Sequence, residues 1–298
     1  MFTKRLARVG LSPQVATALL VLDTMAWGLS YVVIKIGAQT IPPFELIALR
    51  FTLASLVCLV LFYPRFQALT RRALCYGTVL GITMFIGSTT MVYGVQTTDA
   101  STATFIASTK IVFVPLFLAL WTRRLPDKRL LLGILGTTVG IALLSLEDGL
   151  HLSLGAILCI LSAVSYALHI LFTGAMARKE DAVLIGVLQQ VVMAILGWVG
   201  LFFFNTPVMP HGLVPWSTVL VLALVNGVFV FVSQPVAQRY TDAEWTALIF
   251  AMEPVFGAVF SFLLMGERLT LQDGAGAVLV LVSVLLASVK NMPRRFNH

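Results

Sequence analysis

Charged residues are scarce in this chain. Only 11% of its 298 residues are Asp, Glu, Lys or Arg, and 59% are hydrophobic, whereas a soluble globular domain carries about 25% charged residues. Long polar stretches are also missing, because the gaps between the apolar runs are too short for a soluble domain. The runs are continuous and do not alternate with polar residues, as the strands of a membrane barrel would. The composition excludes an ordinary soluble protein and favours an all-α integral membrane protein.

Motifs of enzymes and cofactor sites are missing too. The three cysteines, Cys58, Cys75 and Cys159, stand in or beside apolar runs and do not have the spacing of a metal site. The sequence contains no Gly-x-x-x-x-Gly-Lys-Ser/Thr loop, no His-Glu-x-x-His pair and no Gly-x-Ser-x-Gly turn. We therefore expect no cofactor, no metal and no catalytic activity, and an ATP-driven pump would need a separate subunit.

The net charge of +7 could indicate a nucleic-acid partner, but the basic residues stand in short clusters between the apolar runs. If the N-terminus is placed in the cytoplasm and ten crossings are followed, sixteen of the twenty basic residues fall on the cytoplasmic side. The positive-inside rule requires such a bias in a membrane protein with several spans. We therefore expect a lipid bilayer and no nucleic acid as a partner, a location in the inner (plasma) membrane, and cytoplasmic N- and C-termini.

Ten apolar segments approach the length of about 20 residues that a helix needs to cross a bilayer. They are predicted at approximately 14–36, 43–63, 73–95, 100–122, 129–146, 152–174, 182–204, 216–238, 243–265 and 273–290. Residues that end helices stand in the gaps, among them Pro64, Pro126 and Gly149. The sequence thus predicts ten transmembrane helices.

The second half of the chain repeats the first. A shift of 143 places the Thr-Asp-Ala of residues 98–100 on the Thr-Asp-Ala of residues 241–243, and it sets Lys110 opposite Glu253. Each half, residues 1–147 and 148–298, holds five predicted helices. Because five is an odd number, the two halves must have opposite orientations in the membrane. Inverted repeats of this kind place a substrate site near the bilayer midplane, in a central cavity between the halves.

Three ionisable residues, Asp23, Lys110 and Glu253, fall near the centres of predicted helices. Each would cost about 2.5–3.5 kcal/mol if it were charged and unpaired there, so they must be paired, neutralised or hydrated. Glu253 either binds a cation or a proton, or is a structural acid satisfied by Lys110. Lys110 is either that partner or the anchor of a substrate carboxylate. Arg50, about two turns inside the second helix, is expected to extend toward the interface or to bind a backbone carbonyl.

Polar and aromatic residues form matching stripes on the first and sixth predicted helices. A shift of 139 pairs Asp23, Trp27 and Ser30 with Ser162, Tyr166 and His169, respectively. The i, i+4, i+7 spacing puts each trio on one helix face. The stripes are either facing walls of a cavity or contacts between helices. In the second case Asp23 would make a hydrogen bond between helices, and His169 would be a core residue with its hydrogen bonds satisfied. The eighth helix carries Asn226 and Gln234 and is polar enough to line a path.

Four features together resemble the drug/metabolite transporter superfamily, and in particular its EamA branch of ten-helix carriers. They are Trp27-Gly28-Leu-Ser30-Tyr-Val-Val-Ile-Lys35, Leu49-Arg50-Phe51, Glu253-Pro254-Val-Phe256 followed by Gly266-Glu267-Arg268-Leu, and the five-plus-five repeat itself. The resemblance covers essentially the whole chain. It implies two inverted five-helix halves and a central cavity lined by the first, third and fourth helices of each half.

Members of this family export amino acids, other metabolites or drugs. Some members import or exchange solutes instead. We expect a monomeric membrane transporter that moves a small amphipathic organic solute, an amino acid or related metabolite, by alternating access and in the direction of export. The expected substrate-binding residues are Asp23, Trp27, Tyr31, Tyr93, Lys110, Tyr166, His169, Asn226, Gln234, Glu253 and Phe256. Asp23 and Glu253 would bind an ammonium group and Lys110 a carboxylate.

The sequence leaves two alternatives open. A proton-coupled exporter of cationic drugs would use Glu253 to bind either a proton or the drug. An integral-membrane enzyme or receptor would transport nothing, but no catalytic constellation in the sequence supports that function.

Overall fold

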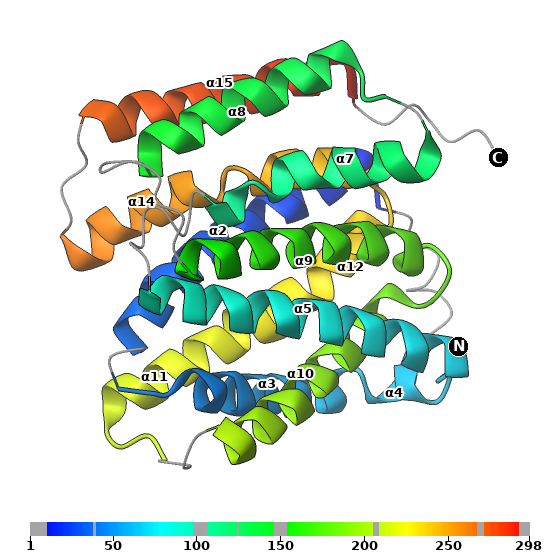
Figure 1. Ribbon diagram of the computed structural model, residues 1–298. Coiled ribbons are helices and arrows are strands. Elements are labelled where there is room, and N and C mark those ends of the chain that lie inside the picture. Colours follow the sequence, from blue (N-terminus) through cyan, green and yellow to red (C-terminus); the bar gives the residue numbers. More distant parts are fainter. Residues whose placement is uncertain are drawn as a thin grey trace.

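The structure is a computed structural model that describes residues 11–37, 40–97, 106–123, 125–145, 154–204, 209–266 and 271–291. Every regular element within these ranges is a helix (Figure 1). The continuous apolar runs explain this result, because inside a bilayer a helix satisfies its backbone hydrogen bonds within its own segment. The predicted all-α class is confirmed for the described residues.

The helices follow the order of the apolar runs. The first half of the chain forms α2 (Pro13–Gly37), α3 (Pro43–Leu61), the short α4 (Tyr63–Phe66), α5 (Arg71–Thr97), α7 (Lys110–Thr122) and α8 (Lys128–Ser145). The second half forms α9 (Leu154–Ala177), α10 (Ala182–Phe204), α11 (Leu213–Val221), the π-helix η1 (Leu222–Val230), α12 (Phe231–Gln238), α13 (Ala243–Phe250), α14 (Glu253–Met265) and α15 (Leu271–Asn291). Both α2 and α3 begin at a proline, which the first turn tolerates because its backbone needs no donor there.

Seven stretches of the described residues are long and apolar enough to cross a bilayer. They are Pro13–Gly37, Pro43–Leu61, Arg71–Gly94, Leu154–Ala177, Ala182–Phe204, Leu213–Gln238 and Ala243–Met265, and the last two consist of successive helices. Two shorter apolar helices occupy Ile106–Thr122 and Gly274–Val284. Each predicted segment overlaps a helix or a run of helices, but the number of ten spans stays a prediction.

Large apolar side chains cover much of the outer surface of the bundle, and several polar and charged residues are buried inside it. Leu132, Phe203 and Leu263 are all more than half exposed on the outside. In contrast, Lys110 and Gln190 are at most 6% exposed. Surrounding lipid favours this distribution, because ionisable residues within a membrane face the interior of the bundle.

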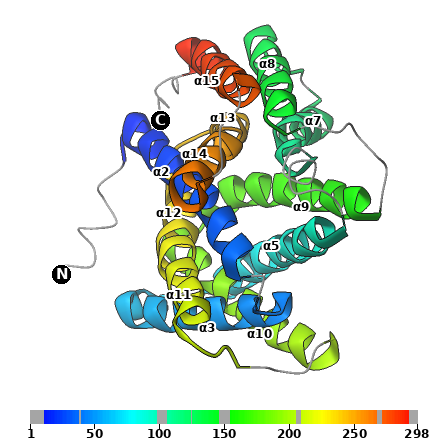
Figure 2. The same ribbon diagram turned by 90° about the vertical axis from the view of Figure 1, so that its left-hand side faces the viewer.

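Helices that are distant in the sequence pack against one another. α2 contacts α12 and α14, α9 contacts α5 and α7, and α3 packs on α10. α8 and α15 form a pair at the edge of the bundle (Figure 2). The start of α2 and the end of α15 lie at the same end of the bundle, on the right in Figure 1. α13 contacts α2, α7 and α9, so helices from both halves of the chain meet at the centre.

Glycine allows α8 and α15 to approach closely. A Cβ atom at Gly140 would lie 2.8 Å from the carbonyl oxygen of Gly276, and one at Gly136 would lie 2.3 Å from the Ser283 hydroxyl. The Gly136-x-x-x-Gly140 spacing therefore serves packing between helices inside the bundle.

A second close contact gives a test of the packing. A Cβ atom at Gly197 of α10 would lie 2.8 Å from the backbone nitrogen of Ala48 in α3. We expect Gly197→Ala to destabilise the protein by about 1–3 kcal/mol, because the backbones must move apart. Gly274→Ala is the matched control, since nothing lies within 4 Å of the added methyl group. Thermal unfolding in detergent measures both variants, and equal melting temperatures would contradict the packing described.

Candidate functional site

Two helices begin at a charged residue inside the bundle. α7 begins at Lys110, after a turn at Thr109, and α14 begins at Glu253, after a turn at Ala251 and Met252. Pro254 follows Glu253 directly and has no backbone N–H with which to continue the hydrogen bonding of α13. The interruption places Glu253 in the first turn of α14, where the helix dipole favours a negative charge.

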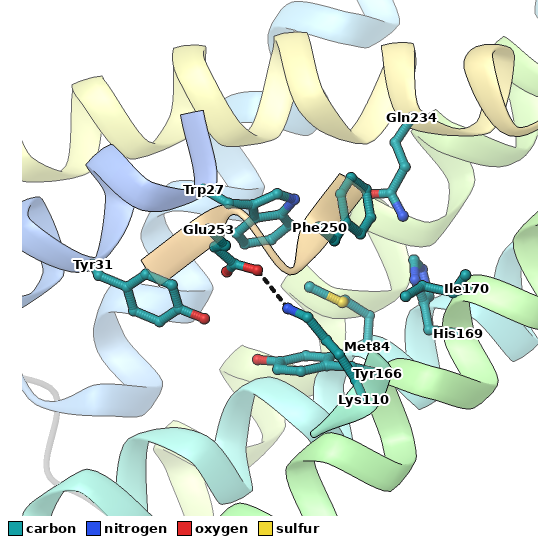
Figure 3. A pocket seen from close by; sticks show the side chains of 10 residues that line it. All are labelled: Trp27, Tyr31, Met84, Lys110, Tyr166, His169, Ile170, Gln234, Phe250 and Glu253. Atoms are coloured by element: carbon teal, nitrogen blue, oxygen red, sulfur yellow. Dashed lines mark hydrogen bonds and ion pairs between the residues drawn. The ribbon is translucent and has the colours of Figure 1, made fainter. Parts of the chain in front are cut away.

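Lys110 and Glu253 form an ion pair, with 2.5 Å between Nζ and Oε2 (Figure 3). Their side chains are only 8% and 5% exposed, respectively. The Lys110 nitrogen also lies 5.5 Å from the centre of the Tyr166 ring. Either charge alone would be costly within a membrane, so each stabilises the other. The two residues that the sequence repeat aligned are thus in direct contact.

The ion pair lies in a small cavity at the centre of the bundle (Figure 3). The lining residues are Trp27, Tyr31, Met84, Lys110, Tyr166, His169, Ile170, Gln234, Phe250 and Glu253. They come from α2, α5, α7, α9, α12, α13 and α14. The cavity offers about 30 Å³ to the centres of water molecules, which is room for about two waters. An organic solute can therefore enter only after the cavity widens.

Most of the residues expected from the sequence meet at this cavity. Seven of the eleven line it: Trp27, Tyr31, Lys110, Tyr166, His169, Gln234 and Glu253. They include both residues of the ion pair. They also include Trp27 and Tyr166, which follow Asp23 and Ser162 by one helix turn in the matching stripes. Trp27 and Tyr166, one residue from each stripe, therefore lie at the same cavity.

Asp23 lies beside this cavity without lining it. The residue is fully buried, and its Oδ1 accepts a hydrogen bond of 2.5 Å from the Ser233 hydroxyl of α12. Its Oδ2 has no hydrogen-bond partner in the described part of the chain. Trp27, one turn later on α2, does line the cavity. The polar stripe of α2 thus divides, with Trp27 facing the cavity and Asp23 facing α12.

Three other expected residues lie elsewhere. The Tyr93 ring packs edge-on against Phe44 of α3, with 5.9 Å between the ring centres. Asn226 is buried within η1. Phe256 lies where α14 approaches Gly28 of α2, at a contact so close that a Cβ atom at Gly28 would lie 2.7 Å from the Phe256 Cβ. Its place in the Glu253-Pro254-Val-Phe256 motif is therefore accounted for by helix packing.

Three apolar residues of the lining, Met84, Ile170 and Phe250, were not expected from the sequence. Met84 and Ile170 have no distinguishing signal, because each is one apolar residue in an apolar run. Phe250 ends α13 just before the turn that leads to Glu253. Its nearness to the Glu-Pro motif is the one signal that could have identified it.

His169 is held in place at the cavity wall. It is 3% exposed, and its Nε2 lies 2.9 Å from Oε1 of Gln189 in α10. The Gln189 amide in turn donates a hydrogen bond of 3.3 Å to the carbonyl oxygen of Phe231. Because the amide oxygen accepts, Nε2 donates the proton and the ring orientation is fixed. The residue is therefore both a satisfied core histidine and part of the lining.

These features define a class of protein. An all-helical bundle with an apolar outer surface and a charged cavity between its helices is the architecture of a membrane transport protein. The sequence profile of the EamA-like transporter family matches residues 14–146 and again residues 153–289, so the chain belongs to that family, within the drug/metabolite transporter superfamily.

Individual relatives agree with this assignment. An uncharacterized transporter of Archaeoglobus fulgidus is 28% identical over 275 residues, which cover 91% of this chain and 85% of the relative. A probable amino-acid metabolite efflux pump of Escherichia coli K12 is 27% identical over 285 residues, covering 90% and 93%. A crystal structure with a TM-score of 0.78 and 17% identity covers 93% of this chain and 98% of its own, which shows a shared fold.

The ion pair leads to a stability prediction. Lys110→Gln or Glu253→Gln alone leaves one buried charge without its partner, and we expect each to lower stability by about 3–5 kcal/mol. The double variant removes both charges and should lose less than the sum of the two single losses. Thermal unfolding of the four proteins in detergent gives the coupling energy. Simple additivity of the two losses would mean that the pair does not stabilise the fold.

Proposed function

We propose that the protein is an inner-membrane carrier, and not an enzyme, that exports an amino acid or a related amphipathic metabolite through the central cavity. The observation that carries this proposal is the Lys110–Glu253 ion pair inside the cavity, beside the aromatic side chains of Trp27, Tyr31 and Tyr166. A buried site with one charge of each sign and an aromatic wall complements a zwitterion that bears an apolar group.

The ion pair suggests how such a solute binds. The carboxylate of a zwitterion replaces Glu253 as the partner of Lys110, and its ammonium group replaces Lys110 as the partner of Glu253. Neither buried charge is then left uncompensated when the pair separates. Without a solute the two side chains bind each other, and the cavity of about 30 Å³ has room only for molecules the size of water. The carrier thus closes around its own ion pair when it is empty.

The helix contacts support an inverted arrangement of residues 1–147 and 148–298. α2, the first helix of one half, contacts α12 and α14, which belong to the third and fourth predicted spans of the other half. α9, the first helix of the second half, contacts α5 and α7 in the same way. Such reciprocal contacts are those of two halves related by a two-fold axis, and they favour ten spans with alternating access about the shared site.

The positions of basic residues support cytoplasmic termini. Arg65 and Arg71 stand in α4 and at the start of α5, and Arg178 directly follows α9. These points lie at the end of the bundle where α2 begins and α15 ends (Figure 1). By the positive-inside rule that end faces the cytoplasm. Export of an amino-acid metabolite is further supported by the printed name of the Escherichia coli relative.

Transport by purified protein in liposomes tests the proposal. We expect uptake of labelled amino acids into vesicles preloaded with unlabelled amino acids to fall at least about tenfold in Lys110→Gln and in Glu253→Gln, since each variant loses one charged contact with the solute. Arg239→Gln, at an exposed position, is the control for loss of a charge. Rates equal to those of the parent protein in both cavity variants would refute the proposed site.

A second arm of the same experiment addresses the alternative function. A proton-coupled exporter of cationic drugs would accumulate a quaternary amine in inverted vesicles under a pH gradient and would lose this coupling in Glu253→Gln. If the parent protein moves the amine but no amino acid, the alternative replaces our proposal. Exchange of amino acids without a pH gradient supports the zwitterion carrier.

A further inference from the structure

α3 carries a buried arginine that has no counter-charge among the residues that the structure describes. Arg50 lies near the middle of Pro43–Leu61 and is 6% exposed. Among the described residues, its Nε has no hydrogen-bond partner and no carboxylate pairs with it. Its guanidinium lies 4.6 Å from the centre of the Phe51 ring. That cation–π contact compensates for only part of the hydration lost on burial.

This finding differs from both roles expected for Arg50. A side chain that extended toward the membrane interface would be exposed at its tip, and one that bound a backbone carbonyl would show that hydrogen bond. Within the described parts of the chain Arg50 does neither. A buried guanidinium whose Nε has no acceptor among the described residues still has a donor to offer to a partner from outside the chain.

Arg50 lies near one wall of the central cavity. The neighbouring Phe51, whose ring the Arg50 guanidinium contacts, packs in one cluster with Trp27 and Tyr166, and both of these line the cavity. Tyr166 also interacts electrostatically with both Arg50 and Glu253. Arg50 is therefore close to a residue of the cavity wall without lining the cavity itself.

Arg50 keeps its positive charge in the buried interior. A guanidinium group stays protonated in proteins, whereas the charge of Lys110 is neutralised by Glu253. A further buried acid, Glu45, belongs to the same helix, but among the described residues no ion pair joins it to Arg50. The charge at Arg50 therefore favours the arrival of an anion.

We infer that Arg50 is an anion-binding residue of the central site, and that the preferred solute carries an acidic group that reaches Arg50 in addition to the charges that Lys110 and Glu253 accept. This inference rests on the proposed function, since it assumes that a solute enters the cavity. The solute reaches Arg50 when the Tyr166 ring turns aside. The planar fork of the guanidinium then accepts a carboxylate through two parallel hydrogen bonds. The site consequently prefers acidic over neutral amino acids.

Acid and amide pairs of one skeleton test the inference. Melting temperatures of the purified full-length protein are titrated with L-glutamate, L-glutamine, L-aspartate and L-asparagine at constant ionic strength. The parent protein should be stabilised at about tenfold lower concentration by an acid than by its amide. Arg50→Gln should abolish this preference, and Arg239→Gln should retain it. An Arg50→Gln protein that still prefers the acids, or a parent protein without any preference, overturns the inference.

Two further measurements keep the result decisive. If Arg50→Gln does not fold, Arg50→Lys is titrated in its place, and it should bind the acids more weakly because an ammonium group lacks the planar fork. Unchanged affinity in Arg50→Lys would contradict a bidentate contact. Flux of the same four amino acids into liposomes separates the two claims. Acid-selective binding without flux rejects the proposed transport and leaves the anion site in place. Flux without acid-selective binding supports the transport and rejects the anion site.

Discussion

The structure depends on the neutralisation of two opposite charges that are buried together. Lys110 and Glu253 lie 143 positions apart in the sequence, yet their side chains touch at the centre of the bundle. Because neither charge is stable alone in a low-dielectric interior, α7 and α14 must begin at the same place and face each other. That requirement brings the two halves of the chain together and leaves a cavity around the pair that no apolar side chain fills.

Transport requires contacts that are strong but exchangeable. An ion pair meets this requirement, because a solute with both charges can replace each partner without leaving the other exposed to lipid. Tight apolar packing, such as that of α8 on α15 through Gly140, can serve as the fixed part of the protein. In the proposed carrier, the contacts that change are therefore those of the central ion pair, and the constant ones are the packed helices at the edge.

The helices and the central pair could be predicted from the sequence because their signals are strong. Continuous apolar runs mark the positions of the helices, and the internal repeat by itself sets Lys110 opposite Glu253. Side-chain direction is harder to predict. Residues at i and i+4 share a helix face but lie about 6 Å apart along the axis, so Asp23 can face Ser233 while Trp27 faces the cavity. Hydropathy shows neither which backbone hydrogen bonds a helix makes nor how deeply one charged side chain is buried. The π-helix η1 and the buried position of Arg50 were therefore not predicted.

The π-helix has a consequence for how the eighth span presents its side chains. In Leu222–Val230 the backbone turns less per residue than an α-helix does, because each hydrogen bond spans one more residue. Every residue after η1 is therefore rotated about the helix axis relative to its place in a regular helix. Ser233 reaches Asp23 and Gln234 reaches the cavity with this added rotation. The direction in which the Ser233 and Gln234 side chains point from the helix axis is thus set by the backbone of η1, which contains neither residue.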